Sequence, residues 1–142
     1  MKYHFKIHKE GSGFWAECLE IKGCSTQADS KEELMKNMKE ALDLILDEPE
    51  DSKILYPLPS SKYEHQKSVA QVEVDPGIAF AFLLRRSRIK KGYTQVQMKD
   101  LLQFKNLFSY QKLEMSKYAN PTLKSLKKIK DAIPDFPFRL LL

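Results

Sequence analysis

The sequence predicts an α+β fold: an antiparallel sheet with one helix, followed by an all-α part. Two observations predict this class. Residues 3–8 and 69–74 alternate side chains with a period of two, which is typical of strands with one buried face. After residue 75 the apolar residues recur at helical spacing instead. We therefore expect two domains, a βββαβ domain at 1–75 and an all-α domain at 76–142.

Three strands are expected near the start of the chain. "YHFKIH" alternates Tyr3, Phe5 and Ile7 with polar neighbours, and the turn signal "EGSG" separates it from "FWAECLEI". These two segments predict a β-hairpin with a loop of several residues. "KGCSTQAD" follows as a short third strand or turn, and "VAQVEV" later in the chain can return to pair with the sheet.

The segment "DSKEELMKNMKEALDLILDEPED" predicts the clearest helix of the chain. Ser30 can cap its first turn while Glu33 reaches back in a capping box. Its apolar residues fall on one face: Leu34, Met38, Ala41, Leu42 and Ile45. Pro49 stops the helix, and residues 49–68 hold three prolines and four serines, so we expect a long loop within the first domain.

Four helices are expected after residue 75. The first, "IAFAFLLRRSRIKKG", is apolar in its first half, strongly basic in its second, and ends at Gly92. Thr94 with Gln97 predicts the cap of the next helix, which turns Met98, Leu101 and Leu102 inward, and Asn106 predicts the cap of the third. "NPTLKSLKKIKDAI" predicts the last, with an apolar stripe of Leu123, Leu126, Ile129 and Ile133, and the apolar tail "DFPFRLLL" is expected to pack.

Charge is distributed unevenly along the chain. Residues 1–68 hold ten lysines and thirteen acidic residues, a net charge of −3, whereas residues 69–142 carry +8. This asymmetry is expected when one half binds a polyanion and the other does not, although surface lysines also promote solubility. No apolar run is long enough for a membrane span and no secretory signal is recognisable, so we expect a cytoplasmic location.

The residues that usually form metal or catalytic sites are few. Cys18 and Cys24 stand six positions apart, which predicts free, partly buried thiols rather than a zinc site. His4 and His8 share a strand face with Lys6 between them, which disfavours a metal ion. We interpret the acidic residues Glu17, Glu20 and Asp29 as a solvated face. The sequence predicts neither a metal site nor a cofactor.

Two short helices joined by a turn, after a basic helix and before a supporting one, are the layout of a helix-turn-helix module. In such a module Gln95 can offer an amide to a phosphate, and Ser109, Gln111 and Lys112 can face the major groove. The alternative is a helical bundle with a solvated lysine face, and the pattern alone does not decide between them.

The segments "YTQVQMKDLL", "YQKLE" and "NPTLKSLKKIKDAI" resemble the Xre-type, or Cro/repressor-type, helix-turn-helix family over residues 78–134. The resemblance implies DNA contacts by Thr94, Gln95, Asn106, Leu107, Phe108, Ser109, Gln111 and Lys112. The chain departs from the family at Lys99 and Asp100 and lacks the turn glycine in "QFKN". Leu107 and Phe108 fall where the family usually places polar base-reading residues.

The segment "GFWAECLEIKGCSTQADSKEELMKNMKEALDLIL" resembles the HicB antitoxin family. Matching positions are Gly23, Cys24, Asp29, Ser30, Glu33, Glu40, Ala41 and Leu42, with departures at Leu19 and Ala28. The resemblance implies a first domain with a degenerate ribonuclease H-like fold that binds a HicA-like ribonuclease toxin. It also implies that the second domain binds operator DNA as a homodimer or homotetramer, and that the protein is not an enzyme.

Two other functions stay open. The first is a stand-alone helix-turn-helix transcription regulator whose first domain senses a ligand or mediates oligomerisation. The second is a weak enzyme derived from the ribonuclease H-like fold, which would require Glu17 and Asp29 to gather around a metal ion.

Overall fold

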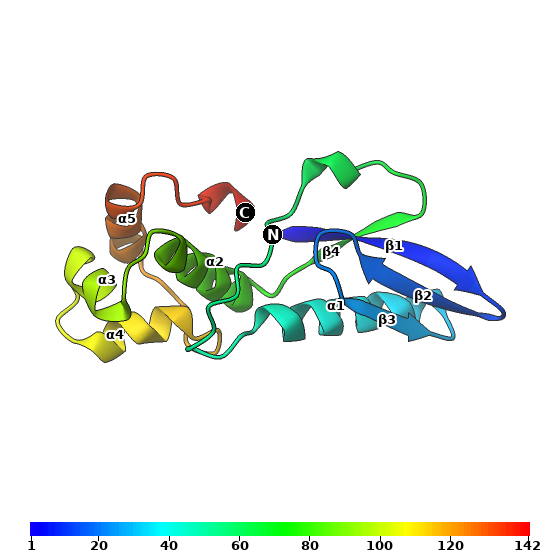
Figure 1. Cartoon of the computed structure of the whole chain (residues 1–142), viewed down its shortest axis with the longest axis horizontal. Coiled ribbons are helices and arrows are strands. Elements are labelled where there is room, and N and C mark those ends of the chain that lie inside the picture. Colours follow the sequence, from blue (N-terminus) through cyan, green and yellow to red (C-terminus); the bar gives the residue numbers. More distant parts are fainter. The chain divides into compact units, whose positions relative to one another are not determined.

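The computed structural model describes residues 1–142 (Figure 1). Its strands are β1 (Lys2–Glu10), β2 (Gly13–Cys18), β3 (Ser25–Ala28) and β4 (Val69–Glu73). Its α-helices are α1 (Lys31–Leu46), α2 (Pro76–Lys90), α3 (Gln95–Leu101), α4 (Leu107–Gln111) and α5 (Leu123–Ala132). Three short 3-10 helices are η1 (Ser61–Tyr63), η2 (Lys112–Glu114) and η3 (Phe138–Leu140). Every strand and α-helix expected from the sequence is present.

The predicted fold class is wrong in dividing the chain into two separate domains. The 142 residues form an α+β chain with a single four-stranded antiparallel sheet and five α-helices, which is too small to hold two separate domains. Its residues pack as two compact units. The sheet unit comprises Met1–Leu46 and Tyr56–Asp75, and the helical unit comprises Asp47–Leu55 and Pro76–Leu142. Because the segment 47–55 packs with the helices, neither unit is one continuous stretch of chain.

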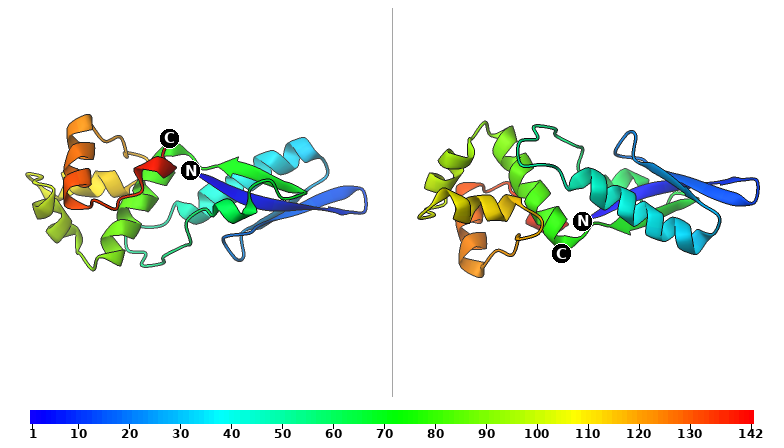
Figure 2. Two further views of the ribbon diagram at one scale, coloured as in Figure 1. Left: turned by 90° about the horizontal axis from the view of Figure 1, so that it is seen from above. Right: turned by 90° about the horizontal axis from the view of Figure 1, so that it is seen from below.

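In the sheet unit the strand order is β3-β2-β1-β4, and all neighbouring strands are antiparallel. The hairpin and the return of the last strand to the sheet are therefore confirmed. In β1, one of the two inner strands, Phe5 lies opposite Cys18 of β2 and Ala70 of β4. The helix α1 covers one face of this sheet, as Figure 2 shows from above and from below. Leu34, Met38 and Leu42 are fully buried there.

The long loop covers part of the opposite face. Tyr3, His4 and Phe5 are consecutive residues of β1 and all are buried, so both faces of the strand are covered at this end. The Tyr3 hydroxyl donates to the Pro57 carbonyl at 2.8 Å, and the ring of Tyr63 lies 6.0 Å from that of His4. The expected alternation of buried and solvated residues therefore fails at His4, because the loop that covers it lies more than fifty residues away in the sequence.

In the helical unit, α2 supplies most of the core. Its residues Ala79 to Leu84 are all buried, and Gly92, at φ 76°, lets the chain turn after the helix. The expected packing of the apolar tail is confirmed: Phe136 is buried, with its ring centroid 6.2 Å from that of Phe80. None of the helices has the length and apolar content that a membrane crossing would need.

Two leucines predicted to face inward are instead exposed. Leu101 is 43% exposed and Leu123 is 86% exposed. Both stand at the end of a short helix, Leu101 as the last residue of α3 and Leu123 as the first of α5. The last helix begins later than "NP" suggested, because the Thr122 hydroxyl accepts from the Ser125 N–H at 3.1 Å and is the N-cap.

Candidate functional site

Helices α3 and α4 are short, and each begins at a side-chain cap. The Thr94 hydroxyl accepts from the Gln97 N–H at 3.1 Å, while the Gln97 side chain accepts from the Thr94 N–H at 2.8 Å. The Asn106 side chain accepts from the Ser109 N–H at 2.9 Å. Both predicted caps are therefore confirmed. Between the helices, Gln103 has φ 60° and takes the left-handed conformation that glycine adopts most easily.

A buried ion pair attaches this helix pair to α2. Arg88 Nε lies 2.7 Å from Glu114 Oε2 and its Nη2 lies 2.9 Å from Oε1, so the pair is bidentate. Arg88 also donates to the Tyr93 carbonyl at 3.1 Å, and the Tyr110 hydroxyl donates to Glu114. The Glu114 side chain is fully buried, and its hydrogen bonds come from Arg88 on α2 and Tyr110 on α4. The network fixes the end of α4 relative to α2.

Burial and the charge of Glu114 shift the ionisation of its partners. The pKa of the Tyr110 hydroxyl is raised, first because the group is buried and second because a phenolate would face the Glu114 carboxylate. Burial disfavours the charge on Arg88, but hydrogen bonds and charge from Glu114 outweigh it and raise the pKa of the guanidinium. The Arg88 guanidinium therefore keeps its charge and the Tyr110 hydroxyl keeps its proton at neutral pH.

The basic cluster expected at the end of α2 is smaller than its sequence suggests. Arg85 is 2% exposed and its Nη2 lies 2.6 Å from Oε2 of Glu48. Arg88 is likewise paired with Glu114, and Lys91 Nζ lies 3.1 Å from Oδ1 of Asp135. The basic end of α2 is therefore less open to solvent than its sequence suggests, because both arginines are paired with acidic residues far away in the sequence.

The DNA-contact residues predicted from the sequence have different environments. Phe108 is 56% exposed, and the Lys112 ammonium lies 5.5 Å from its ring centroid. Leu107 is half-buried. Phe108 on α4 and Lys112 at the start of η2 are both exposed and are therefore open to a partner.

The remaining predicted residues have polar groups occupied within the chain. Thr94, Asn106 and Ser109 participate in the helix caps, where the Ser109 hydroxyl also donates to Asn106 at 2.9 Å. Gln111 Nε2 donates to Gln95 Oε1 at 3.0 Å, which links the first turn of α3 to the end of α4. The Gln95 amide nitrogen is buried and has no acceptor.

A hollow of about 550 Å³ lies beside the starts of both helices. Its lining includes Thr94, Gln95, Val96 and Leu107 together with Glu50 and Asp51 from the segment Asp47–Leu55. This segment is anchored by the Glu48–Arg85 pair and by a hydrogen bond of 2.6 Å from Ser116 to Asp47. Two carboxylates therefore stand beside the helix starts, where they would repel an approaching phosphate.

Sequence reasoning missed this acidic edge and the exposed apolar residues near it. Val96 is 51% exposed and Tyr93 is 37% exposed, and both line the same hollow. Val96 stands two positions before the buried Met98, which places Val96 off the apolar face of α3. This spacing could have predicted from the sequence that Val96 is exposed. Nothing in the local sequence of Glu50 and Asp51 indicates their neighbours, because those lie about forty residues away along the chain.

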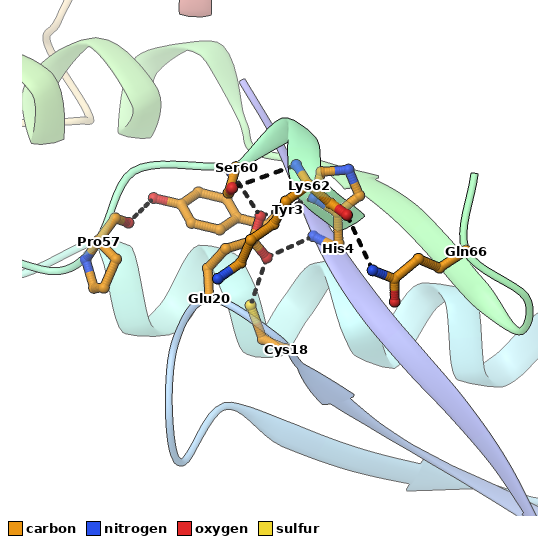
Figure 3. Close-up of polar contacts among 8 residues, drawn as sticks. All are labelled: Tyr3, His4, Cys18, Glu20, Pro57, Ser60, Lys62 and Gln66. Carbon is orange, nitrogen blue, oxygen red and sulfur yellow. Dashed lines mark hydrogen bonds and ion pairs between the residues drawn. The ribbon is translucent and has the colours of Figure 1, made fainter. Parts of the chain in front are cut away.

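A second polar cluster surrounds Glu20 in the sheet unit (Figure 3). Its carboxylate accepts from the backbone N–H of His4 at 3.0 Å and from that of Ser60 at 3.1 Å. His4 Nδ1 lies 2.8 Å from the same carboxylate, and Cys18 Sγ lies 3.8 Å from it. With a side chain 2% exposed, Glu20 is not part of a solvated face, which corrects the interpretation from the sequence.

The Glu20 cluster joins the end of β2, the start of β1 and the loop before η1. A buried carboxylate is costly unless it is hydrogen-bonded, and four donors meet that demand here. Glu17 is half-exposed and Asp29 is exposed, so neither joins Glu20. No group of three or more His, Cys, Asp or Glu side chains is placed to hold a metal ion. The arrangement is suited to anchoring the loop.

No family model and no curated protein matches the sequence.

Proposed function

We propose that this protein is the antitoxin of a type II toxin-antitoxin pair, which neutralises a HicA-like ribonuclease and represses its own operon by binding DNA. One observation carries the DNA-binding part. Two short capped helices, α3 and α4, are joined by a brief turn and held on α2 by the buried Arg88–Glu114 pair. This is the arrangement that presents a recognition helix to the major groove.

The exposed side chains of Phe108 on α4 and Lys112 at the start of η2 have complementary roles in this proposal. Lys112 supplies a positive charge that binds a phosphate or a guanine edge, and Phe108 offers an apolar surface to a thymine methyl group. The hydrogen bond from Gln111 to Gln95 orients both amides, and the Gln95 nitrogen has no acceptor within the chain. After rotation of the Gln95 side chain, a DNA phosphate oxygen can accept a hydrogen bond from this nitrogen.

The toxin-binding part rests on the resemblance of the first half of the sequence to HicB antitoxins and on charge. A ribonuclease that binds RNA presents a basic surface, and the sheet unit, Met1–Leu46 with Tyr56–Asp75, holds nine lysines and eleven acidic residues, a net charge of −2. Complementary potentials speed the encounter of such partners. The proposal places the protein in the cytoplasm, as a homodimer or homotetramer whose two-fold symmetry matches a palindromic operator.

Expression of the neighbouring small reading frame tests the antitoxin proposal. We expect the neighbour alone to arrest growth, and co-expression of this chain to restore growth. If the neighbour alone is harmless, or if this chain does not rescue the cells, the antitoxin proposal is wrong. DNA binding without rescue would instead favour the stand-alone transcription regulator.

Substitution of Lys112 tests the assigned DNA face. Lys112→Ala should weaken binding to the chain's own upstream DNA, and the slope of log affinity against log salt should become shallower by about one. Lys130→Ala, at an exposed position on α5, is the matched control and should leave the affinity unchanged. Fluorescence anisotropy with labelled duplex measures both. Equal affinities for wild type and Lys112→Ala would refute the assigned face.

A further inference from the structure

The two cysteines lie at opposite ends of the turn between β2 and β3. Cys18 is the last residue of β2, and Cys24 directly precedes β3. Both side chains are buried, at 6% and 3% exposure, and both thiols are free. The Cys18 N–H donates to the Cys24 carbonyl at 2.8 Å, so the two residues form a backbone-bonded pair at the mouth of the turn.

The two thiols also interact with each other. The side-chain interaction with Cys18 lowers the pKa of Cys24, although burial opposes this shift. The same interaction, together with burial, raises the pKa of Cys18. The Glu20 carboxylate, 3.8 Å from Cys18 Sγ, further disfavours a thiolate at Cys18. The pair therefore consists of one thiol that ionises more easily than usual and one that keeps its proton.

We propose that Cys18 and Cys24 are a redox modification site, at which hydrogen peroxide produces a reversible intramolecular disulfide. In the first step the Cys24 thiolate attacks the peroxide O–O bond, which gives a sulfenic acid and releases hydroxide. In the second step the Cys18 sulfur attacks the Cys24 sulfur, and the hydroxyl group leaves as water after taking the thiol proton. Peroxide is thereby reduced, and the two thiols are oxidised to a disulfide.

The backbone geometry suits this bond. The register of β2 and β3 pairs Glu17 with Ser25, so Cys18 and Cys24 stand opposite each other at the next position. Directly opposed residues of antiparallel strands have Cα atoms about 4.5 to 5.5 Å apart. Disulfides usually join Cα atoms separated by roughly 4.4 to 6.8 Å, so the bond requires little movement of the backbone. Gly23 has φ 86°, which allows the tight turn that brings the two cysteines together. The bond would pin the end of β2 to the start of β3.

Oxidation also changes the surroundings of Glu20. The Cys18 thiol can no longer act as a donor, so the carboxylate keeps the backbone N–H groups of His4 and Ser60 and the His4 ring. Because both thiols are buried, reaction with peroxide requires a brief local opening of the turn at residues 19–23. The oxidised turn should open less often, because the disulfide closes the loop covalently.

Mass spectrometry of the full chain tests the proposal and does not depend on DNA or toxin binding. Dilute wild-type protein is treated with hydrogen peroxide, then unfolded and alkylated with iodoacetamide. We expect a mass lower by two hydrogen atoms, no alkylation at either cysteine, and full recovery of both thiols with dithiothreitol. Two alkylated cysteines after peroxide treatment would overturn the proposal, and so would a disulfide-linked dimer as the main product.

Two variants test which sulfur reacts first. In Cys18→Ser no second thiol remains to resolve the product, so we expect Cys24 to form a sulfenic acid that dimedone traps. In Cys24→Ser the remaining Cys18 thiol should stay protonated and react more slowly. Circular dichroism establishes that both variants are folded. Faster trapping at Cys18 than at Cys24 would overturn the assigned order of the two steps.

Discussion

The buried Arg88–Glu114 pair gives the sharpest prediction about the helical unit. Glu114→Gln keeps the shape of the side chain but removes its negative charge. Arg88 then remains buried and charged, with a neutral amide in place of the carboxylate that meets it at 2.7 and 2.9 Å. The Tyr110 hydroxyl also loses its charged acceptor. The substitution therefore disturbs three side chains that join α2 to α4.

The expected loss of stability follows from the burial of this pair. Removing one partner of a buried ion pair typically costs about 3–5 kcal/mol, because the other charge stays buried without compensation. Proteins of this size are typically stable by roughly 5–15 kcal/mol in total. Glu114→Gln should therefore remove a large share of the free energy of unfolding, and DNA affinity should fall with it.

Urea denaturation followed by circular dichroism measures the effect. The exposed pair between Lys127 and Asp131, at 2.6 Å, supplies the matched control. Asp131→Asn should cost less than about 1 kcal/mol, because solvent screens an exposed pair. The double variant Arg88→Met with Glu114→Leu should recover part of the loss, since no charge remains buried. If Glu114→Gln costs no more than Asp131→Asn, the pair does not hold α4 on α2.

Three further predictions concern pH, surface charge and capping. The raised pKa of Tyr110 means that the unfolded chain loses this proton near pH 10 while the folded chain keeps it, so the free energy of unfolding should fall above pH 10 by up to about 1.4 kcal/mol per pH unit. Tyr110→Phe should remove the part of this pH dependence that Tyr110 contributes. Urea denaturation at a series of rising pH values measures it, and an equal fall of the free energy of unfolding in wild type and Tyr110→Phe would contradict the prediction. Glu50→Lys and Asp51→Lys should each tighten DNA binding at low salt, because each removes a repulsive carboxylate beside the starts of α3 and α4. If fluorescence anisotropy shows unchanged DNA affinity, these two side chains lie away from the bound DNA. Thr94→Ala should lower the free energy of unfolding by about 1 kcal/mol, because it removes the N-cap of α3. A loss below a few tenths of a kcal/mol in urea denaturation would contradict the capping role of Thr94.

The sequence predicts the elements of this fold well because their signals are local. The cap at Ser30 is confirmed, since its hydroxyl accepts from the Glu33 N–H at 3.2 Å. The alternation in "YHFKIH" likewise predicts β1, and Gly92 predicts the end of α2. Each of these signals lies within a few residues of the feature that it predicts, so the sequence shows it directly.

The charged contacts of the candidate site could not be predicted in the same way. Glu48 pairs with Arg85 across 37 positions, and Arg88 pairs with Glu114 across 26. An arginine in the basic half of a helix is usually solvated, so both looked like part of a basic surface. The burial of Glu20 depends on a loop forty positions away, which brings the Ser60 N–H to its carboxylate. Only tertiary packing creates these partners.

The most direct test of the central claim is the affinity of the full chain for the DNA upstream of its own reading frame. The measurement compares this duplex with an unrelated duplex of equal length at one salt concentration, by fluorescence anisotropy. A sequence-specific repressor should bind the upstream duplex roughly a thousandfold or more tightly than the unrelated one. Equal affinity for the two duplexes, or no binding to either, would contradict the claim that α3 and α4 read an operator.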